Sequence, residues 1–325
     1  MKNFTFKRQL LFVMFMLLGC LSIQAADDGL ITKQITIKLD KAGTLPDRIS
    51  ESKKYLITNL KIVGEVNGTD WLFIREMAGS DFRGDKTDGK LSILDLSDAK
   101  IVGGGLLYFF NVYTSYNDKL GDYAFSGCSG LTSLTLPSSV TSIGNDAFTG
   151  CSGLTSLTIP SGVTSIGGGT FWGCWKLTSL TIPSGVTSID SEAFRGCSGL
   201  TSLTIHSGVT SIGNYAFEGC SGLTSIYVYP EKTPKLGTDI FSGCDAKKCK
   251  VYVPTGTYDD YWLSEFGYFE NIEEFDATDI DNVTTASDAK EVSRYSVNGQ
   301  RLSAPAKGLN IVKYSDGSVK KVVVL

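Results

Sequence analysis

The sequence predicts a β-rich solenoid of stacked repeats, with one main strand in each repeat, an N-terminal cap and a small all-β C-terminal domain. Cysteine recurs every 23 residues from Cys128 to Cys220, and phenylalanine keeps the same interval. Within one repeat, Leu157 and Ile159 alternate with hydroxyl residues, which is the two-residue period of a strand. A single repeat has too few apolar residues to bury a core, whereas stacked repeats bury a continuous one.

Residues 1–25 are typical of a signal peptide. Basic residues precede the apolar run Leu10–Leu18, and the small residue Ala25 offers a cleavage point. The run is too short to span a membrane as a helix. The segment "LLGC" leaves an alternative in which Cys20 is lipidated and anchors the protein. Both alternatives predict export, so we expect a secreted or cell-surface protein on the exterior of the outer membrane.

Residues 26–90 carry no repeat, and we expect them to form an N-terminal capping region. The open end of a solenoid exposes core and a sheet edge, which a cap must cover. This region contains the tripeptide Arg83, Gly84, Asp85 in a polar stretch that predicts a loop. The same tripeptide occurs in integrin ligands. Three residues match often by chance, and we keep them as a candidate ligand-binding site.

The solenoid is predicted over residues 91–275. A first repeat begins at Leu91 and is interrupted by the aromatic insertion "GGLLYFFNVYTSYNDK" before Leu120 restores the frame. After the 23-residue repeats, the segment from Cys249 to Trp262 predicts a last strand. Because specificity should lie where the repeat is broken, the part of the insertion from Leu107 to Tyr116 is a candidate binding segment.

The open face of the main sheet is predicted to show rows of small hydroxyl side chains. Its threonines are Thr135, Thr158, Thr181 and Thr204. These rows could form a flat surface for a glycan, a protein or ice, but serine and threonine are also ordinary soluble strand residues, which is the interpretation we favour. Tyr227 and Tyr229 interrupt the rows. We expect both tyrosines on this face, where aromatic side chains would anchor a ligand.

Seven cysteines remain after the signal region, and five of them occupy equivalent repeat positions. We expect these five to be buried, reduced thiols, because free cysteine behaves as a small hydrophobe and the spacing lacks zinc-type pairs. Cys244 and Cys249 flank a short loop, and the sequence leaves open whether they are bridged. We expect His206, which replaces a proline of other repeats, in an exposed loop. For Trp172 and Trp175, an exposed patch and packing against neighbouring turns are both open.

The composition and motifs argue against several functions. The chain has 30 basic and 34 acidic residues, so it lacks the positive excess that nucleic acid binding requires. The sequence holds no P-loop, GxSxG, HExxH or EF-hand pattern. Glu273 and Glu274 point to opposite faces if extended, unlike a glycosidase pair. We therefore expect no catalytic, cofactor-binding or metal-binding residue, a monomer, and membrane contact only through a lipid or surface anchor.

The repeat "GCSGLTSLTIPSGVTSIGNYAF" closely resembles the BspA-like leucine-rich repeat family of bacterial surface proteins, over about residues 91–262. The resemblance implies a right-handed leucine-rich-repeat solenoid with a strand from each repeat along one face. It also implies a cell-surface or secreted location. Members of this family are associated with adhesion to host matrix proteins and to other bacteria.

Two further segments follow the solenoid. Residues 276–290 are polar, lack aromatic side chains and predict a linker. Residues 291–325 predict a small β domain, and the part from Tyr295 resembles the C-terminal sorting domain of the type IX secretion system. The matching parts are Val297–Arg301, Lys307–Val312 and Lys320 onward, which predict three short strands joined by glycine turns. The terminal Leu325 departs from the basic ending that is usual there.

Two functions from different classes fit this sequence. The first is an exported, non-enzymatic surface protein that binds a host or bacterial protein or glycan and mediates adhesion. The alternative is a structural spacer or glycan-associated component without a protein ligand. A binding protein should group its unusual residues on one face, whereas a spacer should scatter them.

Overall fold

The structure, a computed structural model, describes residues 29–276 and four strand segments beyond them. These segments are 291–296, 301–302, 308–314 and 319–324. The predicted signal segment with Cys20 and all but the first residue of the predicted linker lie outside the described residues. The chain forms two compact units, of which the first ends at Phe275 and the second begins at Asp276.

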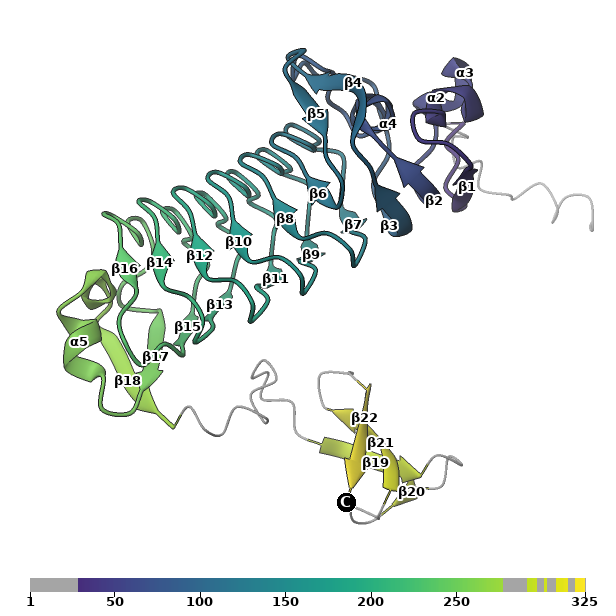
Figure 1. The fold of residues 1–325 in the computed structure, drawn as a ribbon. Coiled ribbons are helices and arrows are strands. Elements are labelled where there is room, and N and C mark those ends of the chain that lie inside the picture. The colour runs from purple at the N-terminus through teal and green to yellow at the C-terminus, as the bar shows by residue number, and fades with distance from the viewer. Residues whose placement is uncertain (1–28, 277–290, 297–300, 303–307, 315–318, 325) are drawn as a thin grey trace, which may run out of the picture. The chain divides into compact units, whose positions relative to one another are not determined.

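The first unit is an elongated solenoid with parallel strands along two sides (Figure 1). The main sheet is interrupted once, into parts of six and four strands, and a second sheet of six strands lies on the other side. The buried side chains of the repeats form the core. Each repeat contributes a strand of three or four residues to the main side. These strands are β7 (Ser133–Thr135), β9 (Ser156–Thr158), β11 (Ser179–Thr181), β13 (Ser202–Ile205) and β15 (Ser225–Val228). The second sheet consists of two-residue strands. They are β6 (Lys119–Leu120), β8 (Ser142–Ile143), β10 (Ser165–Ile166), β12 (Ser188–Ile189), β14 (Ser211–Ile212) and β16 (Lys235–Leu236). The predicted solenoid is confirmed.

A column of stacked phenylalanine rings runs through the core, with one ring from each repeat. Neighbouring ring centroids lie 5.1 to 5.8 Å apart and their planes are within 15° of parallel. The rings belong to Phe125, Phe148, Phe171, Phe194, Phe217 and Phe241. The edge of Trp71 meets the first ring at 5.5 Å, and Phe266 and Phe269 each lie 5.0 Å from the last one. Inclined aromatic rings therefore close both ends of the column.

The cysteines form a second column, in which a thiol donates a hydrogen bond to the phenylalanine carbonyl of the preceding repeat. The Sγ atom of Cys151 lies 3.1 Å from the Phe125 oxygen, and Cys174 repeats the contact at 3.2 Å. All seven cysteines of the described part of the chain are free and buried, which confirms the predicted burial and leaves Cys244 and Cys249 unbridged. Burial raises the pKa of the Cys174 thiol to about 12, so the thiol keeps the proton that it donates.

The N-terminal region extends the main sheet as well as covering the core. Strand β1 (Ile35–Leu39) pairs in parallel with β2 (Asn59–Val66), and β2 pairs in parallel with β3 (Ile93–Ile101), giving the order β1-β2-β3-β7-β9-β11. Its helices are α2 (Leu45–Arg48), α3 (Glu51–Lys54) and α4 (Gly68–Met77). Helix α4 starts with a capping box, in which the Asn67 side chain accepts from the backbone and Asp70 reaches back to the Asn67 N–H. Helix α4 places Trp71 against the first ring of the phenylalanine column.

Two further segments interrupt or end the repeats. The predicted insertion forms a hairpin of β4 (Gly104–Phe109) and β5 (Tyr113–Ser115), which stands at the N-terminal end of the row of turns (Figure 1). The C-terminal end contains β17 (Lys250–Pro254), α5 (Tyr258–Trp262), a 3-10 helix (Glu265–Tyr268) and β18 (Asn271–Phe275). The predicted last strand is confirmed as β17, and β18 adds another. In the described part of the chain, no helix has both the length and the apolar character to cross a membrane.

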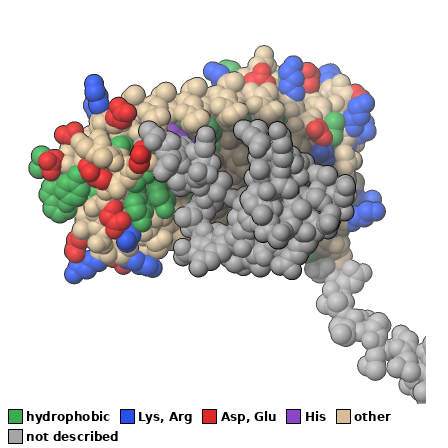
Figure 2. Space-filling view, turned by 90° about the horizontal axis from the view of Figure 1, so that it is seen from below, with side chains coloured by type: hydrophobic (Ala, Val, Ile, Leu, Met, Phe, Trp, Pro, Cys, Tyr) green, Lys and Arg blue, Asp and Glu red, His purple; other side chains and the backbone are tan. Residues whose placement is uncertain are grey.

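The charged side chains are unevenly distributed over the first unit. On the face in Figure 2, Lys, Arg, Asp and Glu gather at the two ends, and the visible stretch between them is mostly uncharged. This agrees with the serine- and threonine-rich repeats that occupy the middle of the solenoid.

The second unit is a four-stranded antiparallel sheet in the order β20-β19-β21-β22. Its strands are β19 (Glu291–Ser296), β20 (Arg301–Leu302), β21 (Gly308–Tyr314) and β22 (Val319–Val324). The predicted all-β domain is confirmed, but it has four strands and not three. The reason is that β19 begins ahead of the segment used for the prediction and pairs along its length with β21.

The phenylalanine column predicts a large cost for removing a ring. Phe194 is fully buried and stacks on rings on both sides, so Phe194→Ala should lower the free energy of unfolding by about 3–5 kcal/mol. Urea denaturation of the variant and the parent protein measures the difference. A loss well under about 1 kcal/mol would contradict the stacked arrangement.

The cysteine column predicts a loss of stability at alkaline pH. Unfolded cysteine ionises near pH 8.5, whereas burial raises the pKa of Cys128 to about 11 and of Cys174 to about 12. The folded state therefore holds more protons above pH about 8.5, and its stability is full below that pH and falls as the pH rises toward 11 to 12. Each such cysteine contributes a slope of up to about 1.4 kcal/mol per pH unit.

Urea unfolding at pH 7.5, 8.5 and 9.5 under a reducing agent tests this, because tyrosine ionises only near pH about 10. Cys174→Ala should show a shallower fall than the parent protein. An unfolding free energy that stays level up to pH 9.5 would mean that these thiols are accessible to solvent.

Candidate binding groove beside the variable turns

The repeats differ from one another mainly in the turn that carries the stacked phenylalanine. In each turn the phenylalanine is followed, after one residue, by a constant Gly-Cys pair, while the residue two places before it and the residue after it vary. The first variable position holds Tyr123, Asp146, Gly169, Glu192, Tyr215 and Asp239. The second holds Ser126, Thr149, Trp172, Arg195, Glu218 and Ser242. Because equivalent turns stack side by side, the variation is concentrated along one edge of the solenoid (Figure 1).

The backbone of these turns is fixed by the neighbouring repeat. All six residues at the first variable position have a positive φ between 52° and 60°, a conformation that side chains other than Asn, Asp and Gly rarely adopt. Hydrogen bonds to the next turn impose it, as when the Tyr123 N–H donates to the Asn145 carbonyl at 2.9 Å and the Phe125 N–H to the Ala147 carbonyl at 2.8 Å. The side chain at this position can therefore change without a change in the scaffold.

The β4–β5 hairpin packs against the first of these turns. The ring of Phe109 stacks on Tyr123 with centroids 4.9 Å apart, and Tyr113 lies 4.9 Å from Tyr123 at a tilt of 52°. Buried Arg75 of α4 lies beneath this contact. It donates to the Tyr123 carbonyl at 2.7 Å and to the Asp81 carbonyl at 3.0 Å, and its guanidinium lies 4.5 Å from the Phe109 ring. Arg75 thus joins the hairpin, the first turn and the end of α4.

A groove with two adjoining hollows follows from this packing. The turn hollow, of about 340 Å³, is lined by Tyr113, Asp122, Tyr123, Asn145, Asp146, Gly168, Gly169, Trp172, Ser191 and Glu192. The hairpin hollow, of about 460 Å³, is lined by Val112, Tyr113, Thr114, Tyr116, Lys119, Leu120, Gly121, Asp122, Ser142 and Gly144. Tyr113 and Asp122 border both hollows, which have volumes typical of ligand sites.

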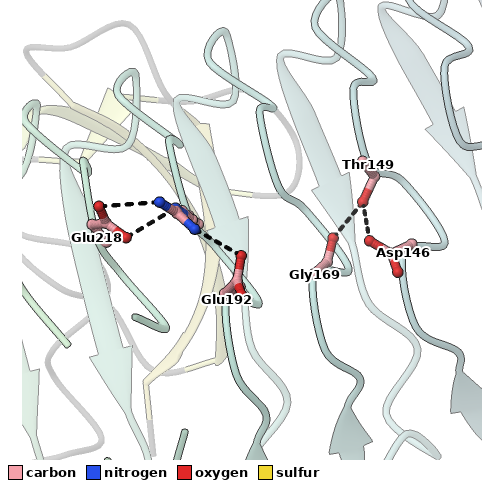
Figure 3. Close-up of polar contacts among 6 residues, drawn as sticks. Asp146, Thr149, Gly169, Glu192 and Glu218 are labelled. Carbon is pink, nitrogen blue, oxygen red and sulfur yellow. Dashed lines mark hydrogen bonds and ion pairs between the residues drawn. The ribbon is translucent and has the colours of Figure 1, made fainter. Parts of the chain in front are cut away.

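The polar groups of the turn hollow are held in place by their neighbours. Thr149 Oγ1 lies 2.8 Å from Asp146 Oδ1 and 2.6 Å from the Gly169 carbonyl oxygen (Figure 3). Burial, followed by the nearby Asp146 carboxylate, raises the pKa of Tyr123 to about 12, so its hydroxyl stays protonated at neutral pH. Its hydrogen bond to the Asp146 side chain also raises this pKa, so the Tyr123 hydroxyl helps to hold Asp146 at the N-terminal side of the hollow.

An ion-pair cluster borders the other side of the hollow. Arg195 Nη1 lies 3.0 Å from Glu192 Oε2, and Arg195 Nε lies 2.9 Å from Glu218 Oε2 (Figure 3). The guanidinium also lies 5.4 Å from the Trp172 ring and 5.7 Å from the Tyr215 ring. Arg195 therefore orients two carboxylates and two aromatic rings along the same edge.

Other side chains of the groove have a structural explanation. Asp122 Oδ1 accepts from the Asn145 N–H at 2.8 Å, and Asn145 Oδ1 accepts from the Gly168 N–H at the same distance. These bonds tie consecutive turns together. The lining side chains that take no part in these bonds between turns include those of Tyr113, Asp146, Trp172 and Glu192.

The threonines of the predicted open face lie largely where the sequence placed them. Thr135, Thr158 and Thr181 are exposed, Thr204 is half-buried, and Thr158 lies directly opposite Thr181 in the sheet. The structure shows them as a row, separate from the side chains that line the groove.

The expectation that Tyr229 lies exposed beside Tyr227 is wrong. Tyr229 follows the end of β15 and is only 7% exposed, because Phe275 covers it at 5.2 Å. Tyr227 is half-buried and stacks on Tyr252 at 4.8 Å. His206 is likewise half-buried and not exposed, with its ring 6.2 Å from that of Tyr229. The two tyrosines therefore do not form a paired anchor on the open face.

The tripeptide Arg83, Gly84, Asp85 lies in an exposed turn, which confirms the predicted loop. Asp81 Oδ1 closes this turn by accepting from the Arg83 and Asp85 N–H groups, each at 2.8 Å. The turn is joined to the groove only indirectly, through the contact of Arg75 with the Asp81 carbonyl. Among the residues that the structure describes, no group of three or more His, Cys, Asp or Glu could hold a metal ion.

The groove contains residues that the sequence interpretation missed. Trp172 and Trp175 are 45% and 57% exposed, which favours the exposed patch over packing against neighbouring turns, and Trp172 but not Trp175 lines the turn hollow. Asp146 and Glu192 were not singled out. Aligning the turns and comparing the two variable positions would have identified both of these acids.

A comparison with known protein families agrees with the repeat fold. A family model described as the BspA type leucine-rich repeat region matches residues 118–248 in six copies, whereas the sequence resemblance extends over about 91–262. No curated protein matches the sequence. The leucine-rich repeat protein of T. pallidum is 23% identical, with 46% of this chain and 78% of that chain covered and a TM-score of 0.35.

Two other solved structures are similar to this chain. A leucine-rich cell surface protein from Faecalibacterium prausnitzii A2-165 is 23% identical, with 75% of this chain and 69% of that chain covered and a TM-score of 0.36. A leucine-rich repeat protein from Eubacterium ventriosum ATCC 27560 is 17% identical, with 69% and 74% covered and a TM-score of 0.34.

The position of Arg75 predicts that it stabilises the groove. Arg75→Ala would remove hydrogen bonds to the Tyr123, Ala124 and Asp81 carbonyls and leave the buried Ala124 carbonyl without a donor. At about 1–3 kcal/mol for the unpaired carbonyl and about 1 kcal/mol for each other lost bond, it should lower the free energy of unfolding by about 3 kcal/mol or more. It should also speed proteolysis within the hairpin. The exposed Arg83→Ala is the control and should stay within about 0.5 kcal/mol of the parent protein. Equal effects of the two substitutions would contradict this role.

Proposed function

Because residues 118–248 are a BspA-type leucine-rich repeat region, we propose that this chain is an exported, non-enzymatic surface protein that binds an extracellular ligand. The ligand is a protein or a glycan of a host or of other bacteria. It binds in the groove between the β4–β5 hairpin and the variable turns. The stacked repeats are the scaffold, and the variable positions give the specificity.

The observation that carries this proposal is the grouping of the variable residues. A spacer has no reason to collect its unusual side chains, whereas in this chain they lie on consecutive turns of one edge. The only long insertion of the described repeats packs against the same edge through Phe109 and Tyr113. Exposed aromatic side chains with polar neighbours are typical of binding surfaces.

The proposed location rests on the two ends of the sequence. The first 25 residues have the pattern of a signal peptide, and the segment from Tyr295 resembles a type IX sorting domain. Such a protein would act outside the cell, secreted or on the exterior of the outer membrane. The net charge of −4 does not favour a nucleic acid partner.

A structural spacer is the second candidate function. Hydrogen bonds between threonines of neighbouring repeats favour it. The Thr155 hydroxyl donates to the Thr132 carbonyl at 3.1 Å, and the Thr178 hydroxyl donates to the Thr155 carbonyl at 3.2 Å. These threonines bond one repeat to the next and so have a structural role. A chain that acts only as a spacer would need this face and not the groove.

A binding screen of the full-length chain against matrix proteins and bacterial and host glycans, at physiological salt, tests the proposal. Three variants locate the site: Trp172→Ala in the groove, Tyr227→Ser on the open face and Asp85→Glu in the exposed turn. We expect Trp172→Ala to weaken the strongest interaction by about tenfold or more, as for an exposed aromatic anchor.

The other two variants should bind within about twofold of the parent protein. Weakening by Asp85→Glu alone would place the site in the exposed turn, and weakening by Tyr227→Ser alone would place it on the sheet. A screen without any specific interaction would favour the spacer.

A further inference from the structure

We propose that the turn hollow binds a neutral glycan, with a sugar ring packed on Trp172 and its hydroxyl groups bound by Asp146 and Glu192. The inference rests on the proposed function, because it names the ligand class of the same groove. It comes from the way in which three consecutive turns differ at their two variable positions.

The middle turn of the three has a gap at its surface. Gly169 is the only glycine among the six first variable positions of the described turns, and the flanking turns hold Asp146 and Glu192 there. The same turn carries Trp172 at its second variable position, with 45% of the residue exposed. An open aromatic surface thus lies between two carboxylates, in a hollow of about 340 Å³.

The gap also orients one of the carboxylates. A Cβ atom at Gly169 would lie 2.5 Å from Asp146 Oδ1, so the carboxylate occupies space that only glycine leaves free. Thr149 Oγ1 lies 2.8 Å from the same oxygen and holds it there (Figure 3). On the far side, the bond from Arg195 fixes the Glu192 carboxylate at 3.0 Å. Both acceptors are therefore ordered before a ligand arrives, which lowers the entropic cost of binding.

The chemistry of this arrangement matches that of a sugar. A pyranose ring has an apolar face of C–H groups, which packs on the electron-rich face of an aromatic ring. Its edge carries hydroxyl groups, which donate strong hydrogen bonds to carboxylates. Successive turns follow the strand spacing of about 4.8 Å, which is close to the width of one sugar ring. A short oligosaccharide can therefore lie along the turns, with its next ring toward Tyr113 and Tyr123.

The charge of the turn hollow favours a neutral sugar over anionic ligands. The described residues that line the turn hollow include three acids, Asp122, Asp146 and Glu192, and no lysine or arginine. This opposes phosphate, sulfate or uronic acid groups. A basic peptide is the competing ligand, because Arg195 is shared between Glu192 and Glu218 and compensates only part of the negative charge around the hollow. The open aromatic surface of Trp172 favours a sugar over such a peptide, and the decapeptide arm of the test distinguishes the two ligands.

The test uses the full-length chain on an array of defined neutral oligosaccharides, with sulfated oligosaccharides and a basic decapeptide of lysine and arginine as separate arms. The dissociation constant of the strongest neutral oligosaccharide is then measured by calorimetry. We expect Trp172→Ala to weaken this binding by about tenfold or more, and Trp175→Ala to change it by less than about twofold. Trp175 is the matched control, because it is 57% exposed nearby but does not line the hollow.

A second variant tests the gap itself. Gly169→Tyr introduces a residue that the scaffold accepts, because two other turns have tyrosine at the equivalent position. These are Tyr123 and Tyr215, with φ of 57° and 56°. It should displace the Asp146 carboxylate and abolish glycan binding. Asp239→Tyr makes the same change in the last aligned turn, outside the groove, and should bind normally. Circular dichroism melting of all four variants verifies that they are folded.

Each other outcome overturns the inference in a distinguishable way. The proposed glycan site is contradicted if no neutral oligosaccharide binds the chain. It is also contradicted if Trp172→Ala and Gly169→Tyr bind the oligosaccharide as tightly as the parent protein does. If the decapeptide or a matrix protein binds and Trp172→Ala weakens it, the glycan inference fails but the groove keeps its proposed function. If neither glycans nor proteins bind the parent chain, the inference and the proposed function fail together.

Discussion

The stacking of one phenylalanine ring on the next is the contact on which the rest of the structure depends. Six rings from successive repeats lie parallel and buried, and the thiol of each following cysteine bonds the carbonyl of the preceding phenylalanine. These contacts fix the distance and the orientation between repeats. Because no repeat can bury its own ring, the column makes the repeats interdependent, and aromatic residues such as Trp71 and Phe266 must close its ends.

The same column fixes the turns through their buried residues, so their surface side chains can vary. The backbone around each phenylalanine bonds to the next turn, so a positive φ is maintained whether the residue is Asp146, Gly169 or Glu192. The chemistry of the side chain at this position can therefore vary while the backbone of the turn stays the same. The core thus explains why otherwise similar repeats can differ in the surface residues of these turns.

The sequence was sufficient to predict the features that recur in every repeat. It was insufficient to predict contacts between residues that are far apart in the chain. The spacing of Phe194 and its equivalents predicted the buried column, and the alternation around Leu157 predicted the strands. The burial of Tyr229 depends on Phe275, which returns from a later strand and leaves no local signal. The groove depends on Arg75, which brings the hairpin to the first turn across the N-terminal region. The insertion could be predicted as a candidate binding segment, but the turn against which it packs could not be predicted.

The location of the groove follows from where the regular stack begins. The first turn has no preceding repeat to bond its Asp122 and Ala124 carbonyls, so the Tyr108 hydroxyl donates to the first and Arg75 donates to the second. The guanidinium that completes the turn also supports Phe109, so closing the solenoid and attaching the hairpin are one structural event. A wall beside the turns is available only at this end. The departures at Gly169 and Trp172 lie two turns from it, within reach of a ligand that also contacts the hairpin.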